Sequence, residues 1–179
     1  PGFWLPAWRW RALGVRSGQA WPGALVGLED FPGRPVALAF WSPAVPSSAG
    51  ALDVLARACH GTGVSCIAVC VDRDAATVPL FARGLSTEVV LAWDRGQHFG
   101  RGPEWSDSPL AVAYDLAETP TVFLLDREHR LVNSWSGELD AGVLRSAVSG
   151  LSTALRPSAA SAVGKRNRAC RSSPFSRAQ

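Results

Sequence analysis

The sequence predicts an α/β domain of three layers, a mixed central sheet with helices on both faces. Continuous apolar runs at residues 35–41, 64–71, 88–93 and 121–126 are typical of strands buried on both sides. Segments with helical spacing separate these runs, and strands joined by helices are expected to be parallel. A chain of 179 residues, 47% of them hydrophobic, is long enough for one such domain with a single core.

The first strand, residues 35–41, follows a Pro-Gly turn and precedes a helix. Apolar residues recur at i, i+3, i+4 and i+7 along this helix, at Leu52, Leu55, Ala56 and Cys59. Ser47 and Ser48 stand before this stripe and can cap the helix N-terminus. Gly61 and Gly63 are expected to end it.

The middle of the chain alternates strands and helices. Residues 64–71 form the second predicted strand, and residues 74–84 form a short helix that contains a proline. Residues 88–93 form the third strand, and residues 95–107 a polar loop. A Ser-Pro pair then opens a helix over residues 108–117, because proline suits the first helical position.

The last part of the predicted domain is a hairpin followed by a helix. Residues 121–126 and 130–135 are strands joined by a tight turn, so they should be antiparallel. The final helix covers residues 138–151. Its predicted apolar face consists of Leu139, Val143, Leu144, Ala147, Val148 and Leu151.

The two ends of the chain differ from the body. Residues 1–23 hold four of the eight Trp residues, and we expect an extended arm whose rings pack on the domain. A membrane-interface segment is the alternative. Residues 153–179 form a basic tail with few large apolar groups, for which we expect disorder. The domain itself is predicted to span residues 24–152.

Charge and composition exclude several classes of protein. Six basic residues and no acid follow position 155, so the rest of the chain carries a net charge of −3 and the basic tail alone raises the pI. A nucleic-acid partner is therefore not predicted. The sequence contains no run of about 18 apolar residues, so no transmembrane segment is predicted. Four Cys are too few for a disulfide scaffold. Met is absent, even at position 1, which indicates a processed chain or a fragment.

Metal and cofactor sites are also not predicted. His60, His98 and His129 are scattered, and no metal-ligand spacing joins them to Cys or carboxylate residues. No cofactor-binding motif stands out elsewhere in the chain.

Four segments carry a resemblance to a known family. The strand ending in Phe40 and Trp41, residues 69–72, residues 91–94 and residues 114–126 match it in kind and order. Together they resemble the thioredoxin-like superfamily, in the redoxin branch of TlpA-like thiol-disulfide oxidoreductases and AhpC/TSA-type peroxiredoxins, over about residues 24–152. The resemblance implies a cis bond between Thr119 and Pro120. By family analogy it also implies a location outside the cytoplasm.

In TlpA-like proteins the Phe-Trp strand leads into a Trp-Cys-x-x-Cys turn at a helix N-terminus. A helix N-terminus stabilises a thiolate, and a second cysteine one turn on resolves the mixed disulfide. In this sequence Ala44 stands at the Trp position, Val45 at the nucleophile position and Ser48 at the resolving position. Val has no reactive atom, and a Ser hydroxyl cannot exchange disulfides.

The peroxiredoxin pattern also lacks its sulfur. That pattern reads Pro-x-x-x-Thr/Ser-x-x-Cys, and Pro43 and Ser47 fit its first two positions. Gly50 then occupies the nucleophile position. No catalytic residue is predicted from either alignment.

The other cysteines are candidates for a displaced active site. Cys66 and Cys70 lie four apart on one strand face, about 13 Å between Cα atoms, too far for a disulfide. These two and Cys59 are interpreted as small core residues. A bridge between Cys59 and Cys66 across the glycine turn stays open. Cys170 lies in the tail, where nothing activates it.

The favoured hypothesis is a domain without dithiol chemistry that binds a protein or peptide partner or has a structural role. Its predicted binding surface places the helix N-terminus opposite the cis-proline turn, and backbone groups there can hold an extended peptide. The candidate binding residues are Trp41, Val45, Ser47, Ser48, Thr119 and Pro120. The alternative is a thiol-disulfide oxidoreductase or peroxidase of the same family that uses a displaced cysteine.

Overall fold

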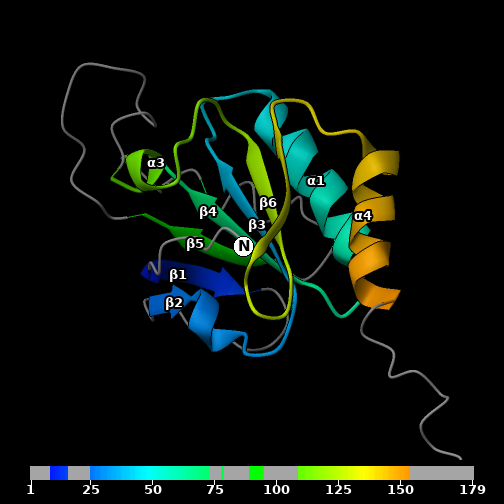
Figure 1. Cartoon of the computed structure of the whole chain (residues 1–179). Coiled ribbons are helices and arrows are strands. Elements are labelled where there is room, and N and C mark those ends of the chain that lie inside the picture. The colour runs from blue at the N-terminus through cyan, green and yellow to red at the C-terminus, as the bar shows by residue number, and fades with distance from the viewer. Residues whose placement is uncertain (1–8, 16–24, 73–77, 79–88, 95–108, 154–179) are drawn as a thin grey trace, which may run out of the picture.

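The structure is a computed structural model that describes residues 9–15, 25–72, 78, 89–94 and 109–153 (Figure 1). These residues form a sheet with the strand order β2-β1-β5-β4-β3-β6-β7. The strands are β1 (Arg9–Val15), β2 (Leu25–Gly27), β3 (Val36–Trp41), β4 (Ser65–Cys70), β5 (Val90–Trp93), β6 (Thr121–Leu125) and β7 (Leu131–Ser136). The helices are the 3-10 turn η1 (Leu28–Asp30), α1 (Ser47–Cys59), α3 (Pro109–Ala113) and α4 (Ala141–Thr153).

The helices cover both faces of the sheet, which confirms the predicted fold class. Helices α1 and α4 lie on one face and α3 on the other (Figure 1). Alternate residues of β3 face the two layers, because successive side chains of a strand point to opposite sides. Ala37, Ala39 and Trp41 face the α1 and α4 side, whereas Val36, Leu38 and Phe40 face the α3 side.

The strand directions match the prediction except at β6. Strands β3, β4 and β5 are parallel, and β6 and β7 form the expected antiparallel hairpin. However, β6 runs antiparallel to β3, although a helix precedes it. The prediction of a parallel strand was therefore wrong. The five residues described for α3 span about 7.5 Å at 1.5 Å per residue, so they do not by themselves return the chain along the length of a strand.

The N-terminal segment contributes a strand that the sequence did not predict. Strand β1 pairs antiparallel with β5 on one side and with β2 on the other. The Trp10 side chain is 1% exposed and belongs to the core on the α3 side of the sheet. The weak periodicity of this segment concealed the strand, since glycine and arginine interrupt the apolar pattern.

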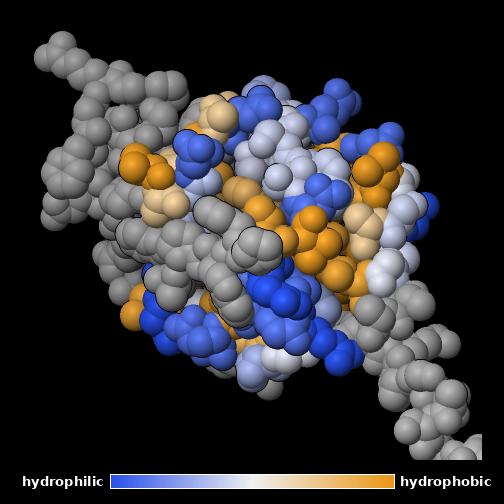
Figure 2. Space-filling view, viewed as in Figure 1, coloured by the Kyte–Doolittle hydropathy of each residue, from blue (hydrophilic) through white to orange (hydrophobic). Residues whose placement is uncertain are grey.

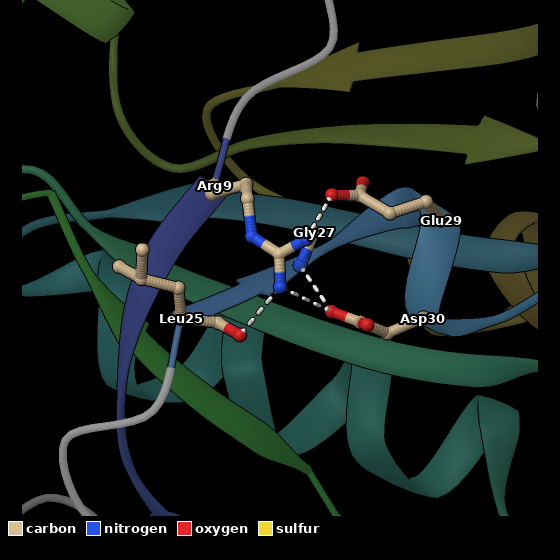
Figure 3. A network of polar contacts seen from close by, with 5 residues as sticks. All are labelled: Arg9, Leu25, Gly27, Glu29 and Asp30. Atoms are coloured by element: carbon tan, nitrogen blue, oxygen red, sulfur yellow. Dashed lines mark hydrogen bonds and ion pairs between the residues drawn. The ribbon is translucent and has the colours of Figure 1, made fainter.

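Arg9 anchors the start of β1 to the segment around η1 (Figure 3). Its guanidinium donates hydrogen bonds to Glu29 Oε1 at 2.6 Å and to the Leu25 carbonyl oxygen at 3.0 Å. The same group lies 3.5 Å from Asp30 Oδ2. Asp30 also accepts a hydrogen bond of 2.8 Å from the Gly27 N–H. These contacts tie β1 and β2 together by side chains as well as by backbone pairing.

Three details of the helices differ from the prediction. Helix α1 begins at Ser47, with Pro46 as its N-cap residue, and no side chain caps it, so the predicted capping by Ser47 or Ser48 was wrong. Helix α3 ends at Ala113 rather than near residue 117. Val143, predicted to lie on the apolar face of α4, is 53% exposed. Leu144, predicted for the same face, is buried as expected, so Val143 lies outside the buried stripe of α4.

The surface of the described part is mixed in character. In the space-filling view, hydrophobic residues lie among hydrophilic ones in the region of α4 (Figure 2). None of the helices described here is both long enough and apolar enough to cross a membrane. Within the same residues, no cluster of three or more His, Cys, Asp or Glu could hold a metal ion. Most of the predicted arm, most of the helix at 74–84, the loop at 95–107 and residues 154–179 lie outside the described residues.

Candidate functional site

The candidate site lies at the edge of the sheet where β3 ends and β6 begins. Phe40 of β3 pairs with Thr121 of β6 in antiparallel register. The residues that follow β3 and those that precede β6 therefore leave the sheet side by side. The antiparallel direction of β6 is decisive, since a parallel strand would place the Thr119–Pro120 turn at the opposite end of β3.

The bond between Thr119 and Pro120 is cis, as predicted. One backbone and one side-chain hydrogen bond hold the turn on both sides. The Gly137 N–H donates to the Pro120 carbonyl oxygen at 2.8 Å, and the Thr121 hydroxyl donates to the Glu118 carbonyl oxygen at 2.7 Å. The turn is thus fixed to the end of β7 as well as to the start of β6.

Ser42 organises the loop between β3 and α1, a role that sequence reasoning missed. Its carbonyl oxygen accepts from the Val45 N–H at 3.1 Å, and its Oγ accepts from the Ala44 N–H at 3.1 Å. Its own N–H donates to Ser48 Oγ at 3.4 Å. The Ser-Pro pair at positions 42 and 43 is a turn signal that could have indicated this.

Ser48 therefore has a different structural role from the predicted one, which was to cap helix α1. Its hydroxyl accepts a hydrogen bond from the strand-end residue Ser42 instead of capping α1. Its own N–H donates to the Val45 carbonyl oxygen at 3.0 Å, so residues 45 and 48 lie one turn apart. This spacing is the one that a pair of exchanging sulfurs would need.

The six predicted binding residues converge on this edge, but they differ in exposure. Trp41 and Ser48 are completely buried, and the Trp41 ring belongs to the core on the α1 side. Thr119 and Pro120 are also buried. Val45 is half-buried and Ser47 is exposed. A ligand could therefore contact the side chains of Val45 and Ser47, whereas Trp41 supports the site from below.

Solved structures of similar architecture identify the fold. DsbF of Mycobacterium tuberculosis, seen in mixed oxidised and reduced forms, matches with a TM-score of 0.63 and 16% identity, covering 82% of this chain and 98% of that one. A secreted disulfide oxidoreductase of the same organism, homologous to E. coli DsbE, matches at 0.58 and 17%, covering 80% and 96%. A thiol-disulfide isomerase from Corynebacterium glutamicum matches at 0.57 and 18%, covering 82% and 95%.

The chain has the thioredoxin-like fold. The cis-proline turn and the mixed sheet are the expected parts of it, and the resemblance inferred from sequence is confirmed at this level. No family model and no curated protein sequence matches the chain.

Two of the described cysteines of this thioredoxin-like domain, Cys59 and Cys66, lie at the end of α1 and the start of β4, away from the candidate site, whereas Cys70 pairs in register with Trp41 at the end of β4. Cys59, Cys66 and Cys70 are free thiols, all buried, as predicted for core residues. A hydrogen bond with the Cys59 side chain, together with burial and the neighbouring Cys59 charge, raises the pKa of Cys66 well above its ordinary value. A thiol must be deprotonated to act as a nucleophile, so Cys66 is poorly suited to rapid disulfide exchange. Cys170 lies outside the described residues.

Among the residues that the structure describes, the exposed charges around the edge are acidic. Residues 42–50 carry no charge. The segment before the cis-proline turn contributes Asp115 and Glu118, and the segment after β7 contributes Glu138 and Asp140, all four exposed. Since the Gly137 N–H is bonded to Pro120, the last two lie at the same edge as the turn. The arrangement favours a ligand without excess negative charge.

Proposed function

We propose that this thioredoxin-like domain binds an extended polypeptide at the edge formed by the α1 N-terminus and the Thr119–Pro120 turn, and does not exchange disulfides there. One observation carries the proposal. The loop from β3 to α1 and the segment with the Thr119–Pro120 cis bond leave the sheet side by side. Val45 and Ser48 lie one turn apart at the start of α1, at the two positions where a dithiol enzyme has cysteines.

The chemistry of the edge supports a polypeptide with basic or neutral side chains. Backbone groups of the loop before α1 and of the turn can pair with an extended chain without any sulfur. The exposed acidic residues, led by Glu118 beside the turn, would attract lysine or arginine side chains. Binding is therefore expected to weaken as salt concentration rises, because exposed charge pairs are screened.

The alternative is an oxidoreductase that uses a displaced cysteine. The similar solved structures are described as disulfide oxidoreductases or isomerases, and one of them is described as secreted. A location outside the cytoplasm would fit either function. Against the enzyme stand the burial of Cys59, Cys66 and Cys70 and the raised pKa of Cys66.

Peptide binding and reductase activity test the two functions separately. The probe is a short fluorescein-labelled peptide of alternating lysine, valine and threonine, followed by fluorescence anisotropy. Ala44→Arg, which adds bulk and positive charge at an exposed position of the loop before α1, should weaken binding at least about tenfold. Val132→Arg adds the same side chain at the start of β7, near the opposite edge, and should leave binding unchanged.

The same preparation is assayed for insulin-disulfide reduction with dithiothreitol. We expect turnover at the background rate. If turnover is well above background and Cys59→Ser or Cys66→Ser abolishes it, the protein is an oxidoreductase that uses a displaced cysteine, and the proposed binding function is wrong. Equal loss of peptide binding in Ala44→Arg and Val132→Arg, or no binding by the unmodified protein, would remove the proposed site.

A further inference from the structure

Two thiols meet in the core at the far end of α1 from the candidate site. Cys59 is the last residue of α1 and Cys66 is the second residue of β4. They are 6% and 4% exposed and belong to the same hydrophobic cluster between the sheet and the helices α1 and α4. Both side chains face the layer between the sheet and α1, and the Cys59 side chain is close enough to have the largest influence on the ionisation of the Cys66 thiol. The two sulfur atoms are thus already neighbours in the reduced protein.

The turn between them holds this arrangement. Gly61 and Gly63 adopt positive φ angles of 69° and 80°, which reverses the chain within a few residues. Thr62 donates two hydrogen bonds to the Cys59 carbonyl oxygen, from its N–H at 3.1 Å and from its hydroxyl at 2.7 Å. The Thr62 carbonyl oxygen in turn accepts a hydrogen bond of 2.5 Å from the Ser152 hydroxyl of α4. The end of α1, the glycine turn and helix α4 are therefore bonded to one another, which fixes the position of Cys59 relative to the start of β4.

We propose that Cys59 and Cys66 form an intramolecular disulfide when the protein meets a small disulfide oxidant, and that this bond fastens the end of α1 to β4. With oxidised glutathione, one cysteine thiolate attacks the disulfide and releases one glutathione. The second cysteine thiolate then displaces the other glutathione. The two cysteines lose two electrons and two protons, and both protons end on the two glutathione thiols.

The third cysteine of this region is not a competitor. Cys70 lies on β4 four residues after Cys66, and at strand rise their Cα atoms are about 13 Å apart. A disulfide needs Cα atoms closer than about 7 Å. Burial of both partners makes the reaction slow, because each thiolate must form in an apolar environment or after local opening. The pair is accordingly a site of stable modification and not an exchange catalyst, and it stands independently of the proposed peptide binding.

A single peptide reports the outcome. Cleavage after Arg57 and Arg73 releases residues 58–73, which contain Cys59, Cys66 and Cys70. The folded protein is incubated with oxidised glutathione and then unfolded in urea with N-ethylmaleimide, so that every remaining thiol is alkylated. It is then digested with trypsin and analysed by tandem mass spectrometry. We expect this peptide to carry one alkyl group, on Cys70, and a disulfide between the other two cysteines. The oxidised protein should melt on the order of 5 °C higher than the reduced protein.

Two variants and an unfolded control complete the experiment. Cys70→Ala should form the same disulfide, and Cys59→Ser should leave Cys66 fully alkylated. In concentrated urea, half oxidation of the two cysteines should require a ratio of oxidised to reduced glutathione at least tenfold higher than in the folded protein. The reason is that only the fold brings the thiols together. Alkylation of all three cysteines after oxidation of the folded protein, or a disulfide that includes Cys70, would overturn the proposal. Equal glutathione ratios with and without urea would overturn it as well.

Discussion

The indole ring of Trp10 packs edge-on against the phenyl ring of Phe40, with 6.4 Å between the ring centroids and 74° between the ring planes. Trp10 comes from the N-terminal strand β1, whereas Phe40 lies in the central strand β3. Both side chains are fully buried. The N-terminal segment therefore contributes directly to the core.

Trp10→Ala should lower the free energy of unfolding by about 3–5 kcal/mol, because it removes a buried aromatic ring and leaves a cavity. Urea unfolding followed by circular dichroism measures this change. Val112→Ala is the matched control, since Val112 is 74% exposed, and should change stability by less than about 0.5 kcal/mol. A loss below about 1 kcal/mol in Trp10→Ala would contradict the placement of β1.

Installing cysteines at positions 45 and 48 should create reductase activity. Val45 is half-buried and Ser48 is fully buried, one turn apart, so Val45→Cys would be accessible for attack and Ser48→Cys would lie behind it. The double variant should reduce insulin disulfides well above the background rate of the unmodified protein. The assay is the turbidity of precipitating insulin B chain with dithiothreitol as reductant.

Ser47→Cys combined with Gly50→Cys is the control for that gain of activity. It keeps the same spacing, but both positions are exposed, and no atom outside the local backbone lies within 4 Å of a Cβ added at Gly50. This variant should stay near background. Higher activity here than in the first variant would show that the TlpA-like alignment is wrong and would favour the peroxiredoxin alignment.

Tyr114 should resist ionisation in the folded protein. Burial, and to a smaller extent the charge of Glu29, raise the pKa of its phenol well above the ordinary value of 10. A group whose pKa is raised on folding stabilises the fold below its unfolded pKa, and that contribution is lost as the pH rises above about 10. Tyr114 is the single tyrosine of the chain, so absorbance at 295 nm reports it alone. Titration with a midpoint near pH 10 without unfolding would contradict its burial.

Asp126 should contribute to stability at neutral pH and lose that contribution in acid. Desolvation alone would raise its pKa, but hydrogen bonds from the Arg130 backbone and guanidinium, and the positive charge of Arg130, lower the pKa below 3.8. Because the folded pKa is lowered, the contribution is present above the unfolded pKa and disappears as the pH falls through the folded pKa. The melting temperatures of the unmodified protein and Asp126→Asn should therefore converge below about pH 4.

Arg130→Gln provides the matching variant. It removes the positive charge and the hydrogen bond of 2.8 Å that the Arg130 Nε–H donates to Asp126 Oδ2. Its melting temperature should show the same convergence with the unmodified protein in acid. A constant difference across the pH range would mean that the pair acts through packing of the β6–β7 turn instead of through charge.

The sequence by itself determined the parts of this fold that local pattern specifies. The apolar runs that became β3, β4 and β6 are buried along their whole length, so hydrophobicity alone marked them. The amphipathic stripe of α1 and the hairpin of β6 and β7 have periods and turn lengths that can be read within a few residues. The cis bond at Pro120 followed from the family resemblance.

Only the tertiary structure decided which segments meet. Three features depend on groups that different elements bring together: the pairing of β1 with β5, the antiparallel direction of β6 and the proximity of Cys59 to Cys66. Ser48 has a local pattern typical of a helix cap, yet its hydroxyl accepts from the end of β3. Periodicity indicates which face of an element is apolar, because the spacing of apolar residues is a property of one element. The partner of that side chain depends on how all the elements pack, and no single segment contains that information.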